Sequence, residues 1–324
     1  PRPPKGPHPL RTPSPRPAAP WWVPPDAPPP PRRVDTAAST TAELLTDRTA
    51  VDAAASGTGD LTDVALLEPI SPVSAPCRIV AQMTNFRSHI TDSGMNPDTV
   101  PLTFFRKTSG SISGPYDDIV KPVHVTLLDY EIEIGLVFGK SLPVGTPVTR
   151  EVLAEYVAGV VIANDVSARD LQLPKTQFYE AKSYPTFTPL GPRLVLLEAG
   201  ELDRFGDLHL TLRVNGQVRQ DMVIGDDIVF SPLAAVTGLS GFQRLDPGDV
   251  LLTGTPAGTA LSAPAKVVEI IGSLLPPHVK WKTFFDRQSN NPKYLRDGDV
   301  VELTAATADG ALDLGTQRTV VRYA

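Results

Sequence analysis

Residues 127–139, LLDYEIEIGLVFG, carry the strongest β-strand pattern in this chain of 324 residues. Successive side chains of a strand point to opposite faces, so Glu131 and Glu133 share one face. The apolar Ile132 and Ile134 lie on the other face. Two carboxylates at this spacing repel each other unless water or a cation separates them. The pattern therefore fits either a solvated face of an edge strand or a pair of oxygen ligands for a hard divalent cation.

The sequence on either side predicts a β-rich protein with a few helices. Residues 148–164 begin as a helix with Thr149 as its N-cap and continue as an apolar, β-branched run. The dipeptide Asn215–Gly216 is a strong hairpin turn between two strand patterns. No alternating βαβ series, glycine-rich phosphate loop or nucleophile elbow is present, so we expect a mixed, β-rich α+β fold. Further strand patterns lie at residues 78–83, 193–198, 208–214 and 218–223, and helical patterns at 41–45, 85–92, 263–276 and 280–288.

Proline and charge divide the chain into parts. Fifteen of the 35 prolines lie in residues 1–31, and residues 1–33 carry a net charge of +5 on a chain whose total is −6. Proline lacks a backbone donor and disfavours both helix and sheet, so we expect residues 1–35 to be a disordered leader. Residues 36–76 form a small N-terminal segment in this interpretation. Residues 77–324 form the main domain, with a helical insertion at about 260–296.

Composition also excludes several classes of function. The acidic balance of the main domain argues against a nucleic-acid or anionic-membrane partner. Cys77 is the single cysteine, which excludes an intramolecular disulfide and a cysteine-cluster zinc site. The apolar runs are much shorter than a membrane span, and residues 1–33 lack the apolar region of a secretory signal. We therefore expect a cytoplasmic protein.

Four other side chains could carry chemistry, each with a plainer explanation. Asp165 ends the apolar run AGVVIAND, where a third metal ligand or a helix N-cap would fit. His89 and Asp92 are neighbours on a helical turn, where an acid can orient an imidazole that takes a proton from water. More often, a histidine and an aspartate at this spacing are simply exposed side by side on the surface. Lys182 lies among small and aromatic residues that could bury it, although an exposed loop lysine is the commoner case.

The order of these motifs along the chain resembles the fumarylacetoacetate hydrolase family over about residues 63–323. The similarity rests on seven blocks that follow one another in the family's order. They are NFRSH at 85–89, GPYDDIVKP at 114–122, DYEIEIGLVFGK at 129–140, ANDVSARDLQ at 163–172, KSYPTFTPLGP at 182–192, PGDVLLTGTPAGT at 247–259 and DGDVVEL at 297–303.

The resemblance implies a β-roll fold, a homodimer and one Mg²⁺ or Mn²⁺ ion in each active site. The ligands it implies are Glu131, Glu133 and Asp165, with Lys182 beside them to neutralise the charge that three carboxylates and a divalent cation leave. His89 would activate water, held by Asp92 in a position where the family has a longer glutamate. Met83 and Phe86 also depart from the usual glycine and tyrosine. The residues that it places against substrate are Arg87, Gln172 and Thr255.

The activity this implies is metal-dependent hydrolysis of a carbon–carbon bond in a 1,3-dicarbonyl or acylpyruvate-like oxo acid. His89, oriented by Asp92, would activate the water, and Lys182 would stabilise the departing enolate. An alternative uses the same site for isomerisation or decarboxylation of an oxo-diacid through a metal enolate. A third possibility is a family member that binds a metal and a ligand without chemistry.

Overall fold

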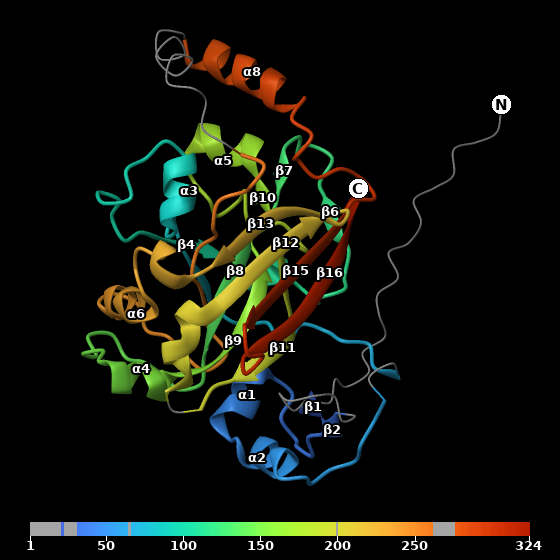
Figure 1. The fold of residues 1–324 in the computed structure, drawn as a ribbon, viewed down its shortest axis with the longest axis vertical. Helices are drawn as coiled ribbons and strands as arrows, with labels where there is room; N and C mark the ends of the chain where they lie inside the picture. The colour runs from blue at the N-terminus through green and yellow to red at the C-terminus, as the bar shows by residue number, and fades with distance from the viewer. Residues whose placement is uncertain (1–20, 23–30, 64–65, 199, 262–275) are drawn as a thin grey trace, which may run out of the picture.

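Two β-sheets stacked face to face form the body of the protein. The computed structural model describes residues 21–22, 31–63, 66–198, 200–261 and 276–324. In Figure 1 the long strands of the smaller sheet, yellow to red, lie across the green strands in the middle of the larger one. Within the described residues, no helix is long and apolar enough to cross a membrane.

The larger sheet has seven strands in the order β4-β3-β14-β8-β9-β11-β5. Most neighbours are antiparallel, but β14 runs parallel to β3 and β5 runs parallel to β11. Its strands are β3 (Ile79–Gln82), β4 (Phe104–Lys107), β5 (Ile112–Ser113), β8 (Ile132–Phe138), β9 (Val157–Asn164), β11 (Thr188–Leu196) and β14 (Val250–Leu252).

The smaller sheet has five strands in the order β13-β12-β15-β16-β6, and two further strand pairs flank the sheets. Its strands are β6 (Ile119–Lys121), β12 (Leu208–Val214), β13 (Gln217–Val223), β15 (Val300–Thr307) and β16 (Asp313–Tyr323). The flanking pairs are β1 (Trp21–Trp22) with β2 (Arg32–Arg33), and β7 (Leu128–Asp129) with β10 (Ser167–Ala168).

Short helices cover the edges of the sheets rather than a whole face. In Figure 1, α1 and α2 lie at one end of the molecule and α8 at the other, beyond α5. The helices are α1 (Thr41–Thr46), α2 (Thr49–Ala55), α3 (Arg87–Asp92), α4 (Arg150–Tyr156), α5 (Arg169–Lys175), α6 (Pro232–Ser240) and α8 (Pro277–Gln288). The 3₁₀ helices are η2 (Ser109–Ser111), η3 (Glu201–Asp207) and η4 (Gly225–Asp227).

Strand β8 lies in the middle of the larger sheet and is buried on both faces. Ile132 and Ile134 pack between the two sheets against Leu210 of β12. Val137 faces the other way and packs with Leu45 of α1. The sequence also allowed an edge strand with one solvated face. The structure shows instead that β8 is a central, buried strand. Both glutamates of this segment are buried instead.

Several local predictions are confirmed by the structure. Thr149 caps α4 by accepting a hydrogen bond from Val152 N, and the chain then continues directly into β9. Asn215 and Gly216 form the turn between β12 and β13, both with positive φ. The predicted helix at residues 280–288 is part of α8, whereas the one at 263–276 lies almost entirely outside the described residues.

The predicted leader lies mostly outside the described residues as well. Within it, β1 pairs with β2 in antiparallel register, Trp21 opposite Arg33. Val34 is buried in a small cluster with Val51 and Ala54 of α2. Residues 32–34 therefore belong structurally to the small N-terminal segment.

The buried side chain of Asn85 joins three distant segments. Its Nδ2 donates to Phe230 O at 3.1 Å and to Thr253 O at 2.8 Å, while its Oδ1 accepts from Phe230 N at 2.8 Å. Gly254, beside Thr253, has φ +89°, and a Cβ there would lie 2.8 Å from that of Asn85. This close packing holds the segment before α3 against the end of β14.

We expect Asn85→Ala to lower the free energy of unfolding by about 3 kcal/mol, because it leaves buried donors and acceptors unpaired. The measurement is the midpoint of urea unfolding. Asn290→Ala is the matched control, since this exposed amide makes one local hydrogen bond at 3.1 Å and should cost less than about 0.5 kcal/mol. Equal shifts for the two variants would contradict the role assigned to Asn85.

Candidate metal centre and active site

The pairing of β8 with β9 brings three carboxylates together. Ile132 pairs with Asn164 and Glu133 with Ala163. One residue further along, Asp165 N donates to Glu131 O at 2.9 Å, which places Asp165 opposite Glu131. Cross-strand neighbours share a face, so all three acids project to the same side as Val137. One carboxylate oxygen from each of the three lies within 4.8 Å of those of the other two, and the three side chains are buried.

Two buried lysines contact this triad. Lys182 Nζ lies 2.6 Å from Glu131 Oε2 and 2.5 Å from Asp165 Oδ2. Lys107, the last residue of β4, contacts the other oxygen of Asp165 and donates to Phe187 O at 2.9 Å. Lys182 is 3% exposed, so the exposed loop lysine that the sequence also allowed is wrong.

A buried arginine holds the outer side of Glu131. Arg169, the first residue of α5, contacts Glu131 Oε1 and lies 2.8 Å from Asp129 Oδ2. The same guanidinium donates to Gln172 Oε1 at 2.8 Å. Asp129 in turn accepts from Ala260 N at 2.8 Å, so it ties this cluster to the start of the insertion.

Glu133 differs from its two neighbours in its surroundings. Its Oε2 accepts from Gly254 N at 2.8 Å, and no ion pair reaches it from the described part of the chain. Burial, followed by the charges of Asp165 and Glu131, raises the pKa of Glu133 well above its usual value. Burial alone would also raise the pKa of Glu131, but Lys182 and Arg169 lower it to about 2.

These charges leave Glu133 as the one carboxylate of the triad without an ion pair to the described residues. Burial on its own would lower the pKa of Lys182, but the charges of Asp165 and Glu131 raise it, so its ammonium is retained. Glu133 is then the carboxylate left over, and it is stable here only with a proton or a cation beside it. Three carboxylate donors at this separation suit a hard divalent metal ion. The triad can therefore hold one.

The structure changes the charge balance expected from the sequence. Three carboxylates, a divalent cation and Lys182 gave a neutral site. Lys107 adds one positive charge, whereas Arg169 and Asp129 offset each other. Burial lowers the pKa of Lys107, whereas the charge of Asp165 acts in the opposite direction; with both lysines as ammonium groups, a site holding a divalent cation would carry one net positive charge. That charge favours an anionic ligand.

Two residues expected to contact substrate are buried near this cluster. Gln172 is held by Arg169. Thr255 donates its hydroxyl to Ile132 O at 2.8 Å and accepts from Gln220 Nε2 at 2.9 Å. The hydroxyl proton of Thr255 is thus used to hold the strand between Glu131 and Glu133.

The residues expected on the turn after β3 are placed differently. His89 lies in α3, and its Nδ1 is buried with no hydrogen-bond partner among the described residues. Asp92 is exposed at the end of this helix, and no described contact joins it to His89. Arg87 is also exposed and pairs with Asp98 at 2.8 Å. The water-activating pair expected from the sequence is therefore not formed.

The surroundings of His89 keep its ring neutral. Burial lowers the pKa of His89; the charge of Glu131 acts in the opposite direction, and those of Arg169 and Lys182 in the same one. A neutral imidazole is able to accept a proton at neutral pH. Since the charges of Glu131, Arg169 and Lys182 all act on its pKa, we infer that His89 lies near the carboxylate cluster.

Sequence reasoning missed Lys107, Asp129 and Arg169. Asp129 and Arg169 lie inside two of the motif blocks, and Asp129 directly follows the apolar pair Leu127–Leu128. Lys107 follows Phe105 by two residues, so both share a face of β4. The alternation of side chains along this strand could have indicated that Lys107 points toward the interior, but it does not identify Asp165 as its partner.

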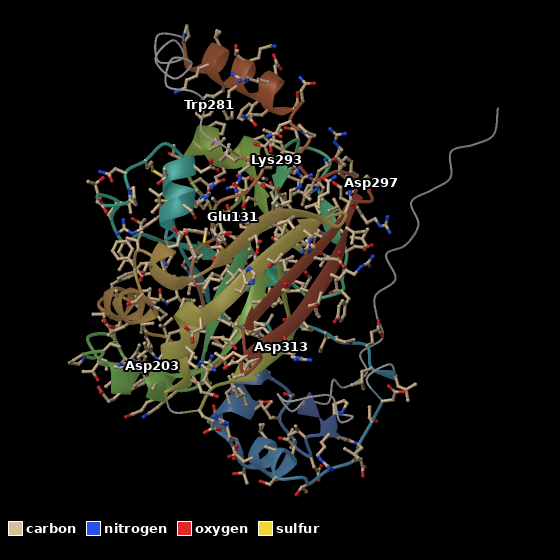
Figure 2. The ribbon with its side chains drawn as sticks, viewed as in Figure 1. Glu131, Asp203, Trp281, Lys293, Asp297 and Asp313 are labelled. Atoms are coloured by element: carbon tan, nitrogen blue, oxygen red, sulfur yellow. The ribbon has the colours of Figure 1, made fainter. Side chains whose placement is uncertain are left out.

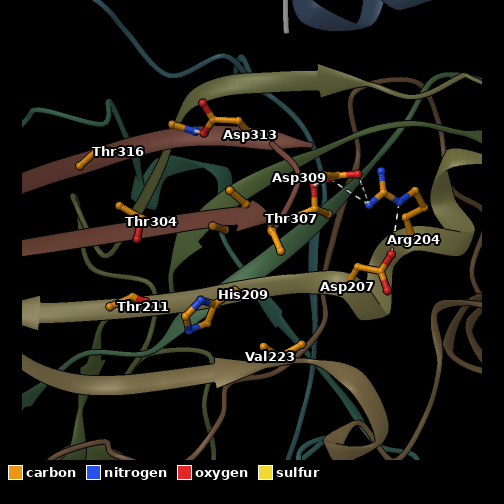
Figure 3. Close-up of a pocket in the computed structure, with 14 residues that line it drawn as sticks. Arg204, Asp207, His209, Thr211, Val223, Thr304, Thr307, Asp309, Asp313 and Thr316 are labelled. Atoms are coloured by element: carbon orange, nitrogen blue, oxygen red, sulfur yellow. Dashed lines mark hydrogen bonds and ion pairs between the residues drawn. The ribbon is translucent and has the colours of Figure 1, made fainter. Parts of the chain in front are cut away.

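A separate hollow of about 620 Å³ lies on the outer face of the smaller sheet. Figure 3 shows Thr211, Thr304 and Thr316 along its floor, where these three residues face one another across β12, β15 and β16. His209 stands beside them and is exposed with its partner Asp221. None of the residues expected at the active site lines this hollow. In Figure 2, Glu131, the first residue of the triad, is labelled well away from Asp313, which lines the hollow.

Comparison with known proteins agrees with this geometry. A model of the fumarylacetoacetate (FAA) hydrolase C-terminal domain matches residues 78–322. The chain is 35% identical over 196 residues to the mitochondrial oxaloacetate tautomerase Fahd2a of Rattus norvegicus, and the alignment covers 59% of each protein. The chain thus spans about three fifths of the length of this curated relative.

Two solved structures share the fold. One is 5-carboxymethyl-2-hydroxymuconate delta-isomerase from Mycobacterium smegmatis, with a TM-score of 0.62 and 27% identity over 82% of this chain and 86% of that one. The other is the fumarylacetoacetate hydrolase of Exiguobacterium antarcticum, with a TM-score of 0.62 and 26% identity over 91% and 92%. The chain belongs to the fumarylacetoacetate hydrolase family, whose named members here are a tautomerase, an isomerase and a hydrolase.

The proton on Glu133 yields a test of the metal centre. Because the folded protein holds this proton more tightly than the unfolded chain, metal-free stability should fall as pH rises from about 4.5 through the raised pKa. A divalent cation replaces the proton, so the affinity for Mn²⁺ should rise with pH. Calorimetry in two buffers with different ionisation enthalpies should detect a proton released on Mn²⁺ binding. Binding without proton release would contradict this account.

Glu133→Gln separates the contribution of Glu133 to metal binding from its effect on the stability of the metal-free protein. We expect it to weaken Mn²⁺ binding by about 100-fold or more, since a ligand is lost. The neutral amide should nevertheless raise the melting temperature of the metal-free protein at pH 8, where the glutamate is costly to bury. Glu155→Gln, at an exposed pair with Lys140, is the control and should change neither quantity.

Proposed function

We propose that this protein is a divalent-metal-dependent enzyme that moves a proton on a small, anionic 2-oxo acid by way of its enolate. The observation that carries the proposal is the buried triad Glu131, Glu133 and Asp165, contacted by Lys182 and Lys107. This is the isomerase or tautomerase alternative of the sequence analysis. Mg²⁺ or Mn²⁺ is the ion we expect, because both favour oxygen ligands.

The residues around the triad suit an acid whose negative charge increases during the reaction. A bound divalent ion would polarise the oxo group of the substrate as a Lewis acid. Lys182 would donate a hydrogen bond to the oxygen on which charge develops. Arg169 keeps Glu131 and Gln172 in place, and the low exposure of the cluster strengthens each of these interactions.

His89 is the proposed proton acceptor and donor. Its ring is neutral at pH 7, because burial lowers its pKa, so it can take a proton from the carbon next to the oxo group. The same ring would return the proton to another position, which needs no water and no acidic partner. Asp92, exposed and unpaired with His89, supports this chemistry over attack by water.

The names of the relatives support the same choice. The Rattus norvegicus relative is an oxaloacetate tautomerase, and one structural relative is a delta-isomerase of a carboxylated hydroxymuconate. Both names describe proton movement on a carboxylated substrate. An oxo-diacid such as oxaloacetate is therefore the first substrate to test.

Hydrolytic cleavage of a carbon–carbon bond is the second candidate. It is favoured by the unpartnered Nδ1 of His89, to which an acid could bind, and by the name of the Exiguobacterium antarcticum relative. For this reaction Asp92 would have to turn toward His89 and hold the ring while water attacks. The homodimer and the cytoplasmic location stay predictions, and the mitochondrial location in a relative's name is a property of that protein.

Two substitutions distinguish these candidates. We expect His89→Ala to lower kcat for the enol-to-keto conversion of oxaloacetate by about 10²- to 10⁴-fold, as for loss of a general base. Asp92→Asn should change kcat by less than about threefold, because Asp92 has no part in the proton transfer. The acid limb of the wild-type profile should have its midpoint below the usual histidine value of about 6.5. A loss of 100-fold or more in Asp92→Asn would instead show that Asp92 takes part in the proton transfer, which would contradict the role proposed for His89 alone.

Analysis of the products distinguishes proton transfer from carbon–carbon bond cleavage independently of the variants. Oxaloacetate and a set of acylpyruvates should be incubated with enzyme from which metal has been chelated and to which Mg²⁺ or Mn²⁺ has been returned. We expect metal-dependent exchange of deuterium at the carbon beside the oxo group, with no cleavage. Rapid release of two acids from an acylpyruvate would overturn the proposal in favour of hydrolysis.

A further inference from the structure

We propose that Asp227 and Ser88 form a pair that positions His89 over the metal centre. This inference rests on the proposed function, in which His89 transfers the proton. Asp227 ends η4, between β13 and α6, whereas Ser88 directly precedes His89 in α3. The two residues are 139 positions apart in the sequence. Asp227 is a positioning residue here, since it acts through Ser88.

One carboxylate holds two groups of Ser88. Asp227 Oδ1 accepts from Ser88 N at 2.9 Å, and Asp227 Oδ2 accepts from Ser88 Oγ at 2.5 Å. The amides in the first turn of a helix have no partner within the helix, and Phe86, the N-cap of α3, provides no side-chain cap. Asp227 therefore caps α3 from another segment, and its two contacts oppose rotation of the helix about its axis.

The hydroxyl of Ser88 links this pair to the metal centre. Ser88 Oγ also accepts from Ala257 N at 3.2 Å. Ala257 lies in residues 253–257, the loop that holds the triad, because Gly254 N donates to Glu133 Oε2 at 2.8 Å. Thr255 in the same loop donates to Ile132 O at 2.8 Å. The loop thus contacts a metal ligand and the residue next to His89 at once.

Other contacts hold the start and the buried face of α3, whereas the pair holds the residue next to His89. Ile90 is fully buried and anchors one face of the helix. The pair of Arg87 with Asp98 is exposed and worth little. Asn85 holds the chain before the helix through Phe230 and Thr253, independently of Asp227. Loss of Asp227 should therefore leave the fold intact while it lets α3 turn.

Asp227→Ala tests the proposal on full-length protein with Mn²⁺. We expect kcat for oxaloacetate tautomerisation to fall by about tenfold, because a small misplacement of a reacting group is costly. KM and the Kd for Mn²⁺ should stay within about twofold, since no ligand is touched. Asp227→Asn keeps an acceptor for Ser88 N and should recover most of the loss. Asp226→Ala is the matched control, because Asp226 is exposed and makes no hydrogen bond or ion pair to described residues.

A second variant and an NMR spectrum distinguish a displaced His89 ring from a general loss of structure. Ser88→Ala removes the hydroxyl contacts alone and should give a smaller fall in kcat in the same direction. In protein labelled with ¹⁵N-histidine and loaded with Mg²⁺, the His89 ring signals, assigned through His89→Ala, should shift in Asp227→Ala. They should stay in place in Asp226→Ala. Unchanged ring signals together with unchanged kcat would overturn the proposal.

The double variant His89→Ala/Asp227→Ala completes the test. If Asp227 acts through His89, its removal should have no further effect once His89 is gone. An equal tenfold loss in both backgrounds, or a loss confined to Mn²⁺ affinity, would overturn the inference alone. A His89→Ala variant with full turnover would instead overturn the proposed function, so the two failures are distinguishable.

Discussion

Mutual repulsion of three buried carboxylates is the constraint on which the rest of this site depends. Glu131, Glu133 and Asp165 are brought together by one ladder of hydrogen bonds between β8 and β9, so they cannot separate without breaking the central sheet. Such charges are tolerated in an apolar interior only when each is paired or neutralised. Lys107, Lys182 and Arg169 neutralise part of the charge, and a divalent cation can neutralise the remainder.

This balance explains why the cations come from three different elements. Lys107 ends β4, Lys182 follows α5, and Arg169 begins α5. Each contacts the triad from another direction and leaves Glu133 without an ion pair from the described residues. Breaking one buried pair leaves an uncompensated charge, so substitution of any of these cations would disturb the fold as well as the chemistry.

The sequence was sufficient for the fold class, and its resemblance to the family, more than any local pattern, pointed to the triad. Alternation along residues 127–139 placed the two glutamates on one face, and the end of an apolar run located Asp165. The sequence could not show that β8 is central rather than an edge strand, because sheet order depends on contacts between distant residues. The same reason hid Lys107, whose partner Asp165 is 58 residues away, and Asp227. The expected contact of Asp92 with His89 relied on local spacing alone, and the direction of an exposed side chain does not follow from spacing.

The two ends of the insertion are fastened independently of what lies between them. Asp129 accepts from the amides of Ala260 and Leu261 at its start. At its end Asn291 Nδ2 donates to Ala260 O at 2.9 Å, and Leu295 N donates to Leu128 O at 2.9 Å. The insertion therefore leaves and rejoins the domain at nearly one point beside the carboxylate cluster. Such a closed junction lets the intervening length and sequence diverge during evolution, or be exchanged by design, while the frame of the metal centre stays constant.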